Sequence, residues 1–216
     1  MRNVLLAIML CGVGTGTPVA SSQVVEPSVV PESWQLRFRF EDPRRISVFL
    51  PDREEPVVYW YMTYRVENPG PEDVDFLPRF ELVTDTLKRV PSEINVSPDA
   101  FRAIQRRSGN PLLIPPERVF SRLLQGRENA RHSVAIWPDF DPEAKGFRIY
   151  VSGLSGESRR VRNRAFDPAE PESETNQRYF TVFKTLEIPY LLPAGSDARM
   201  EVRAVRQPEK QRWIMR

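Results

Sequence analysis

The chain is poor in the residues that most catalytic and metal sites require. Its 216 residues include one cysteine, Cys11, and one histidine, His132. A single cysteine cannot close a disulfide within the chain, and this pair cannot supply the ligands of a zinc site. A Ser–His–Asp or Cys–His site would need His132 as its base, and no serine motif accompanies it. The segment Gly153-Leu154-Ser155-Gly156-Glu157 lacks the second glycine of a nucleophile elbow, so it predicts a strand-end turn.

Neither sign of charge is in excess, which bears on partners. Lysine and arginine number 31 against 29 acidic residues, for a net charge of +2. Nucleic-acid-binding proteins concentrate positive charge, so the balance gives no electrostatic case for that partner. Acids are plentiful, yet no motif selects a carboxylate pair for glycoside hydrolysis. We therefore expect a non-enzymatic protein with no catalytic residues and no cofactor, and a hydrolase assembled only by the fold is the least favoured alternative.

One acidic loop leaves calcium as an open alternative. Asp139, Asp141 and Glu143 alternate along the chain, and oxygen ligands at this spacing could hold Ca²⁺. Pro142 and Lys145 disfavour a loop of the EF-hand kind. We expect a turn here and no metal site.

Long hydrophobic runs are missing as well. The apolar run at residues 4–13 follows one positive residue and precedes small residues that end at Ser22. A membrane span needs about 20 apolar residues, so this pattern is typical of a secretory signal, residues 1–22. Acylation of Cys11, as in a lipoprotein, would need a small residue before it, and Leu10 stands there. We expect a soluble exported chain, periplasmic or extracellular, with no transmembrane anchor after cleavage.

Proline, by contrast, is abundant, with 21 residues scattered between apolar runs. This spacing suits many short strands separated by turns. Residues 23–33 predict an extended linker or arm, and residues 34–216 a single domain. The run at 57–66 is apolar or aromatic on both faces, which predicts a central strand. Further strands are predicted over residues 34–41, 46–50, 74–84, 133–137, 147–153, 179–189 and 200–205, with a short apolar piece at 213–215.

The middle of the chain predicts an insertion of two short helices, at about residues 97–125. Ser97 followed by Pro98 is a helix start, and Gly109 ends that element. Pro115-Pro116-Glu117 is read as a second start, with Val119, Phe120, Leu123 and Leu124 on one stripe. About eight strands with turns between them then argue for an antiparallel β-sandwich that carries this insertion.

The segment Tyr61-Met62-Thr63-Tyr64-Arg65-Val66-Glu67-Asn68-Pro69-Gly70, followed by Val74-Asp75-Phe76, resembles a strand pair of bacterial immunoglobulin-like modules. Many uncharacterised exported envelope proteins contain such modules. The similarity covers about thirty residues, and it implies an immunoglobulin-like sandwich without implying an activity. The helical insertion and a charged loop at residues 159–175 depart from a minimal module, and loops on a rigid sandwich commonly carry binding.

Two groups of side chains are candidates for a binding surface. Tyr59 and Tyr61 share one face of the predicted central strand and could line an exposed surface, or could pack against the helical insertion. The densest basic cluster contains four arginines that could contact an anionic polymer, or could be solvated and balanced by nearby acids. These four are Arg159, Arg160, Arg162 and Arg164. We therefore predict an envelope interaction or structural module with a protein partner, and as the alternative a carbohydrate- or polymer-binding module.

Overall fold

The computed structural model describes residues 25–193 and 203–216, which are mostly β, as predicted. Their strands form two larger antiparallel sheets and one short two-stranded sheet. The predicted signal peptide, residues 1–22 with Cys11, lies outside the described residues. Within the described ranges, none of the helices has the length and apolar character needed to cross a bilayer.

The first sheet is built around one long strand. Its members are β1 (Arg37–Phe40), β2 (Arg44–Val48), β3 (Val57–Asn68) and β8 (Gly126–Pro138). Strands β1 and β2 pair with successive parts of β3, and β8 pairs with its other edge. The predicted central strand is thus confirmed, and it is buried on both faces because each face packs on a different layer.

A second long strand organises the larger sheet. Its members are β5 (Arg79–Thr84), β6 (Arg89–Pro91), β9 (Gly146–Ser152), β10 (Ser158–Arg162), β11 (Tyr179–Leu191), β12 (Val205–Arg206) and β13 (Arg212–Met215). Strands β10 and β9 pair with successive parts of β11, while β13 pairs with its middle and β12 with its C-terminal end. The 3₁₀ turn η3 (Pro208–Lys210) lies between β12 and β13. Of the strand predicted over 200–205, residues 200–202 lie outside the described ranges.

One hydrophobic core is shared by the two sheets. Met62 and Trp60 of β3 belong to the same buried cluster as Ile149 of β9 and Ile188 of β11. The Trp60 ring lies 5.6 Å from the Phe147 ring, edge to face, which is a favourable aromatic geometry. Burying each such side chain contributes about 2 kcal/mol, so the sheets hold together through burial rather than cross-links.

The run predicted as one strand over residues 74–84 is divided. Strand β4 (Val74–Phe76) ends before Leu77-Pro78, and β5 begins at Arg79. Proline has no N–H for a ladder, so a break at this dipeptide is expected physically. Strand β4 then pairs with β7 (Ser121–Leu123) in the short two-stranded sheet.

Helix α1 (Pro98–Ser108) confirms the first half of the predicted insertion. The Ser97 hydroxyl accepts a hydrogen bond from the Asp99 N–H, 3.2 Å, and Pro98 occupies the first turn. Gly109 ends the helix with φ 62°, in the left-handed region that glycine adopts without strain. Each end of the helix is therefore specified by the residue found there.

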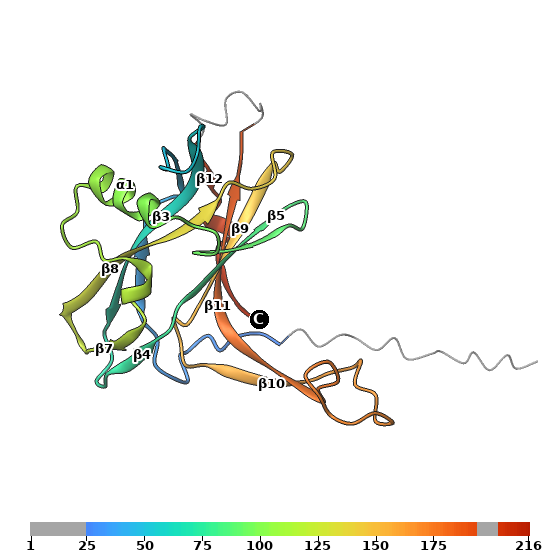
Figure 1. Cartoon of the computed structure of the whole chain (residues 1–216). Coiled ribbons are helices and arrows are strands. Elements are labelled where there is room, and N and C mark those ends of the chain that lie inside the picture. The colour runs from blue at the N-terminus through green and yellow to red at the C-terminus, as the bar shows by residue number, and fades with distance from the viewer. Residues whose placement is uncertain (1–24, 194–202) are drawn as a thin grey trace, which may run out of the picture.

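Tyr59 and Tyr61 do not line an exposed surface, and that prediction is wrong. They are 2% and 5% exposed, because α1 lies on the outer face of the first sheet and packs Ala100 and Ile104 against them (Figure 1). The alternative, packing against the helical insertion, is the one that the structure shows. This aromatic pair stabilises the docking of the helix and offers nothing to a ligand.

The second predicted helix is also wrong, since residues after Pro115 form only the 3₁₀ turn η1 (Pro116–Arg118) followed by β7. The four apolar side chains taken as one helical stripe are divided between interior and solvent. Val119 and Leu123 are buried, whereas Phe120 and Leu124 are 48% and 45% exposed. Pairing of β7 with β4 buries Leu123 opposite Val74, and this contact replaces the helical turn.

Candidate functional site: the β10–β11 ribbon and its base

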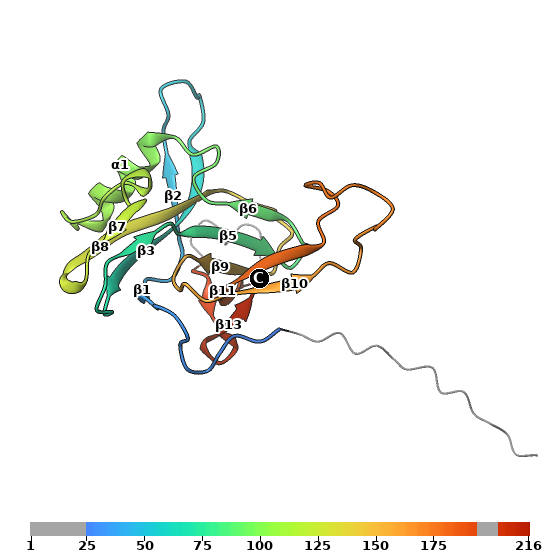
Figure 2. The same cartoon turned by 90° about the horizontal axis from the view of Figure 1, so that it is seen from below.

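A two-stranded ribbon extends beyond the two-sheet core. It consists of β10 and the first residues of β11, paired from Ser158 opposite Phe183 to Arg162 opposite Tyr179. Figure 1 and Figure 2 both show it projecting away from the rest of the fold, with residues 163–178 at its far end. The sequence predicted a charged loop from residue 159, so the assignment of residues 159–162 to a loop is corrected to a strand.

Because side chains alternate along a strand, the four candidate arginines do not share one surface. Arg160 and Arg162 lie on one face of the ribbon, together with Tyr179 and Phe183 of β11. Arg159 lies on the opposite face, and Arg164 follows the end of β10. We call the outer part of this surface, formed by Arg160, Arg162, Tyr179 and Thr181, the ribbon face; Phe183 lies at its base.

The arginines of the ribbon face are exposed to solvent, and within the described residues no carboxylate neutralises their charges. The Arg160 guanidinium lies 4.2 Å from the centre of the Tyr179 ring, a cation–π contact. Among the residues that the structure describes, Arg160, Arg162 and Arg164 form no ion pair with a carboxylate. The alternative from the sequence was a solvated loop balanced by Glu170, Glu172 and Glu174; the three arginines are solvent-exposed, and among the described residues they form no ion pair with these acids. Tyr179 and Phe183 add rings that are 39% and 49% exposed.

The loop at the end of the ribbon is held by one buried amide. The side-chain NH₂ of Asn176 donates to the carbonyls of Asp167, Glu170 and Pro171, at 2.9, 3.2 and 3.2 Å. Its Oδ1 accepts from the Asp167 N–H at 2.9 Å. These bonds tie residues 167–176 into a closed loop, which fixes where β10 ends and where β11 begins.

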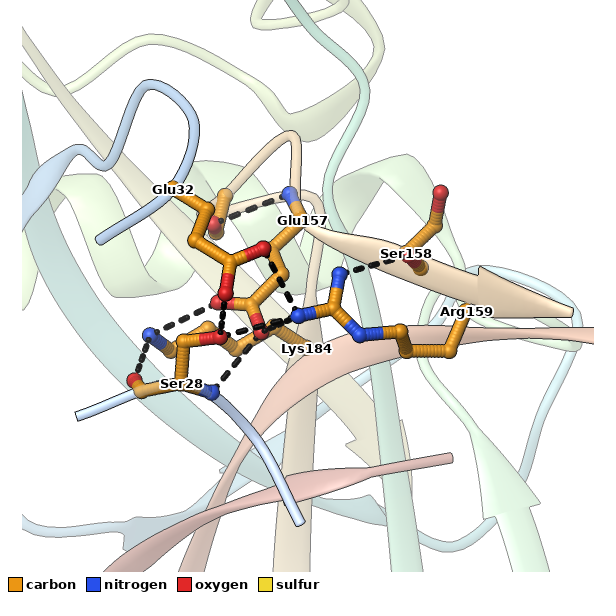
Figure 3. Close-up of polar contacts among 7 residues, drawn as sticks. Ser28, Glu32, Glu157, Ser158, Arg159 and Lys184 are labelled. Atoms are coloured by element: carbon orange, nitrogen blue, oxygen red, sulfur yellow. Dashed lines mark hydrogen bonds and ion pairs between the residues drawn. The ribbon is translucent and has the colours of Figure 1, made fainter. Parts of the chain in front are cut away.

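At the base of the ribbon a buried ion pair holds the N-terminal segment in place (Figure 3). The Lys184 ammonium lies 3.1 Å from Oε2 of Glu157, and the two side chains are 3% and 1% exposed. Ser28 donates its backbone N–H to Glu157, 2.8 Å, and its carbonyl accepts from Lys184, 3.0 Å. The Ser28 N–H is the main cause that lowers the pKa of the Glu157 carboxyl. We call Ser28, Glu157 and Lys184 the arm cluster.

Arg159 lies against the arm cluster and does not form part of an open binding surface. Its guanidinium donates to the Ser28 hydroxyl at 2.9 Å and to Glu32 at 2.8 Å, and lies 3.4 Å from Glu157 (Figure 3). The predicted linker over residues 23–33 is therefore, from residue 25 on, an arm fixed to the sheet. Of the four candidate arginines, Arg159 is therefore the one whose guanidinium is already bonded within the chain.

A cleft of about 810 Å³ lies on the outer face of the larger sheet, where the ribbon begins. Phe183 and Tyr150 line it from the sheet, Phe120 and Glu117 from the segment around η1, and Glu93 from the turn after β6. Burial raises the pKa of Glu93 to about 7. Its carboxylate accepts from the Ile136 N–H at 3.1 Å, and the residue itself has φ 64°. Sequence reasoning missed this cleft, because its walls come from six separate segments of the chain.

The residues weighed for catalysis are not brought together. His132 lies on β8, where its ring nitrogen meets the Asn110 amide at 3.3 Å, and partial burial lowers its pKa. Ser155 is 5% exposed and accepts from the Glu157 N–H, which confirms the strand-end turn. Within the part of the chain that the structure describes, His132 and Ser155 form no hydrogen bond with each other, so they do not make a base–nucleophile pair.

The acidic loop after β8 uses its carboxylates for internal bonds. Asp139 accepts from the Trp60 indole N–H at 2.9 Å and from Arg45 at 2.6 Å. Asp141 accepts from the Thr86 hydroxyl at 2.6 Å and from the Glu143 N–H at 2.9 Å. Among residues 25–193 and 203–216, no group of three His, Cys, Asp or Glu side chains is placed to hold a metal ion.

Comparison of the chain with protein-family models, with curated proteins and with solved structures gave no match in any of the three. The candidate site therefore rests on its own geometry.

Proposed function

We propose that this chain is an exported, non-enzymatic binding module of the cell envelope, an immunoglobulin-like sandwich whose ribbon face binds an anionic polymer. The observation that carries the proposal is the set of arginines without ion pairs on a projecting ribbon. A guanidinium binds carboxylate or phosphate groups through two parallel hydrogen bonds. Within the described chain, neither Arg160 nor Arg162 forms such a pair with a carboxylate. The signal-like sequence at residues 1–22 supports export.

The shape of the ribbon supports a linear ligand. Side chains on one face of a strand recur about every 6.6 Å, so the ribbon face presents charge and aromatic surface at a regular spacing. Arg160 and Arg162 share this face with Tyr179, which is partly exposed and whose ring holds the Arg160 guanidinium through a cation–π contact. A polymer with acidic groups at intervals matches this arrangement better than a small anion does.

The test is retention on an immobilised acidic polysaccharide at increasing salt concentration. We expect the Arg160→Gln/Arg162→Gln double variant to bind at least about tenfold more weakly than the unsubstituted protein, since two charge-assisted contacts are lost. The matched control is Arg106→Gln/Arg127→Gln, which removes the same charge from two exposed arginines elsewhere. Equal weakening by both pairs would show that only net charge matters and would refute the ribbon as the binding arm.

A second function, binding of a protein partner, is favoured by one specific feature. Strand β10 pairs only with β11, so its outer edge is unpaired in the described chain, and the neighbouring Phe180 is 45% exposed. An unpaired edge is a site for addition of a strand from another chain. In-cell crosslinking from position 180, followed by mass spectrometry, would recover one defined protein neighbour if this function holds and none if the ligand is a polymer alone.

A further inference from the structure

We propose that the cleft beside Phe183 binds a sugar ring of the polymer whose acidic groups contact the ribbon face; this inference rests on the proposed function. It gives the polymer a chemical class, an anionic polysaccharide, and separates it from polyanions without sugars.

The cleft continues the ribbon face along a single strand. Tyr179, Thr181, Phe183 and Thr185 lie on one side of β11, and the last two line the cleft. Two residues of a strand advance about 6.6 Å, so Tyr179 and Phe183 stand roughly 13 Å apart along the chain direction. A linear ligand that lies along β11 therefore reaches the arginines and the cleft together.

The cleft offers aromatic surface of the kind that stacks on the apolar face of a sugar ring. Phe120 and Phe183 are 48% and 49% exposed, whereas the rings of the core are buried. Of the other two rings in the lining, Phe80 is buried and Tyr150 is covered by the Arg216 guanidinium, 4.0 Å from its centre. The cleft thus has two partly exposed rings. Its volume of about 810 Å³ lies within the usual range for a ligand pocket, roughly 300–1,000 Å³.

The polar groups of the cleft suit hydroxyls rather than a strong anion. Arginine and glutamate side chains both line it, and Arg216 is already ion-paired with Glu81. Glu93, Glu117 and Ser92 add acceptors and a hydroxyl along one wall. This mixed set contrasts with the ribbon face, whose charged residues are arginines. The cleft therefore selects by ring shape and hydrogen bonding, while the ribbon selects by charge.

The test compares two polymers at equal total charge, hyaluronate, in which an uncharged sugar alternates with an acidic one, and inorganic polyphosphate, which contains no sugar. We expect the full protein to bind hyaluronate at least about tenfold more tightly, because stacking and hydroxyl contacts add to the ionic ones. The Phe120→Ala/Phe183→Ala variant should lose this preference and keep its affinity for polyphosphate. Phe49→Ala, which removes a ring that is 76% exposed elsewhere, should change neither affinity.

Each outcome decides between the cleft and the ribbon. Equal affinity for the two polymers, or a preference that survives the cleft substitutions, overturns the sugar site and leaves the ribbon standing. A preference lost in the cleft variant, together with unchanged affinity for both polymers in Arg160→Gln/Arg162→Gln, supports the cleft and overturns the ribbon as the binding arm. Binding of neither polymer overturns both proposals. Circular dichroism melts of all variants show whether a loss reflects unfolding.

Discussion

Replacing Lys184 by methionine tests how strongly the arm cluster stabilises the fold. Methionine keeps most of the side-chain length and removes the ammonium, so Glu157 loses its 3.1 Å ion pair inside a site where both side chains are at most 3% exposed. Removing one partner of a buried ion pair costs about 3–5 kcal/mol. The Ser28 N–H and Arg159 still contact Glu157, so we expect the lower end, about 3 kcal/mol.

The assay is urea unfolding followed by tryptophan fluorescence. Trp213 is a local reporter, because the Lys184 ammonium lies 5.5 Å from the centre of its ring. The matched control is Lys145→Met, which removes the same charge from an exposed side chain and should change the free energy of unfolding by less than about 0.5 kcal/mol. The double variant Glu157→Gln/Lys184→Met removes both buried charges and should be clearly more stable than Lys184→Met alone.

Two results would contradict this reasoning. The first is a loss of less than about 1 kcal/mol in Lys184→Met, which would mean that water reaches Glu157 and solvates it. The second is a double variant that loses as much as the two single variants added together, which would show that the charges act independently.

Three further predictions concern the pH dependence, helix α1 and the loop of the ribbon. Glu93 has a folded pKa of about 7, above the ordinary value of 4.5, so between these two pH values the folded state holds a proton that the unfolded state has lost. Stability should therefore fall by up to about 3 kcal/mol as pH rises from 4.5 to 7, and urea melts of Glu93→Gln should lack this slope. Ser97→Ala removes the hydrogen bond that caps α1 and should lower the unfolding free energy by about 1 kcal/mol in the same melts. Asn176→Ala frees the carbonyls that it ties together, so trypsin should cut residues 162–178 faster than in the unsubstituted protein, and equal rates would show that other contacts hold the loop.

The strands were predictable where alternation or a two-sided apolar run was long enough. Residues 57–66 carry large apolar groups on both faces, and only a central position covers both. Helix α1 was predictable for a different reason, since Ser97, Pro98 and Gly109 each act locally on the backbone. The failed second helix shows the limit of such signals. Proline starts η1 as well as a helix, and the choice depended on a β4–β7 pairing that no local pattern contains.

The candidate site was predictable only in part, because the sequence does not show which residues far apart in the chain come into contact. The sequence pointed to the arginines, and Val161 between Arg160 and Arg162 is the alternation that would have revealed a strand. It could not show that Arg159 is committed to Ser28 and Glu32, because those contacts join residues more than a hundred positions apart. The burial of Tyr59 likewise depended on where the helix docks.

The arm cluster has a consequence for how the chain acquires its fold. Ser28 is separated by 129 residues from Glu157 and by 156 residues from Lys184. Contacts of such long range form late, because the intervening chain must first be ordered. The arm is synthesised before either of its partners, so it stays undocked until β10 and β11 are in place. Resistance of residues 25–33 to proteases therefore reports that the rest of the domain is complete, and in a pulse-chase experiment it should be the last protection to appear.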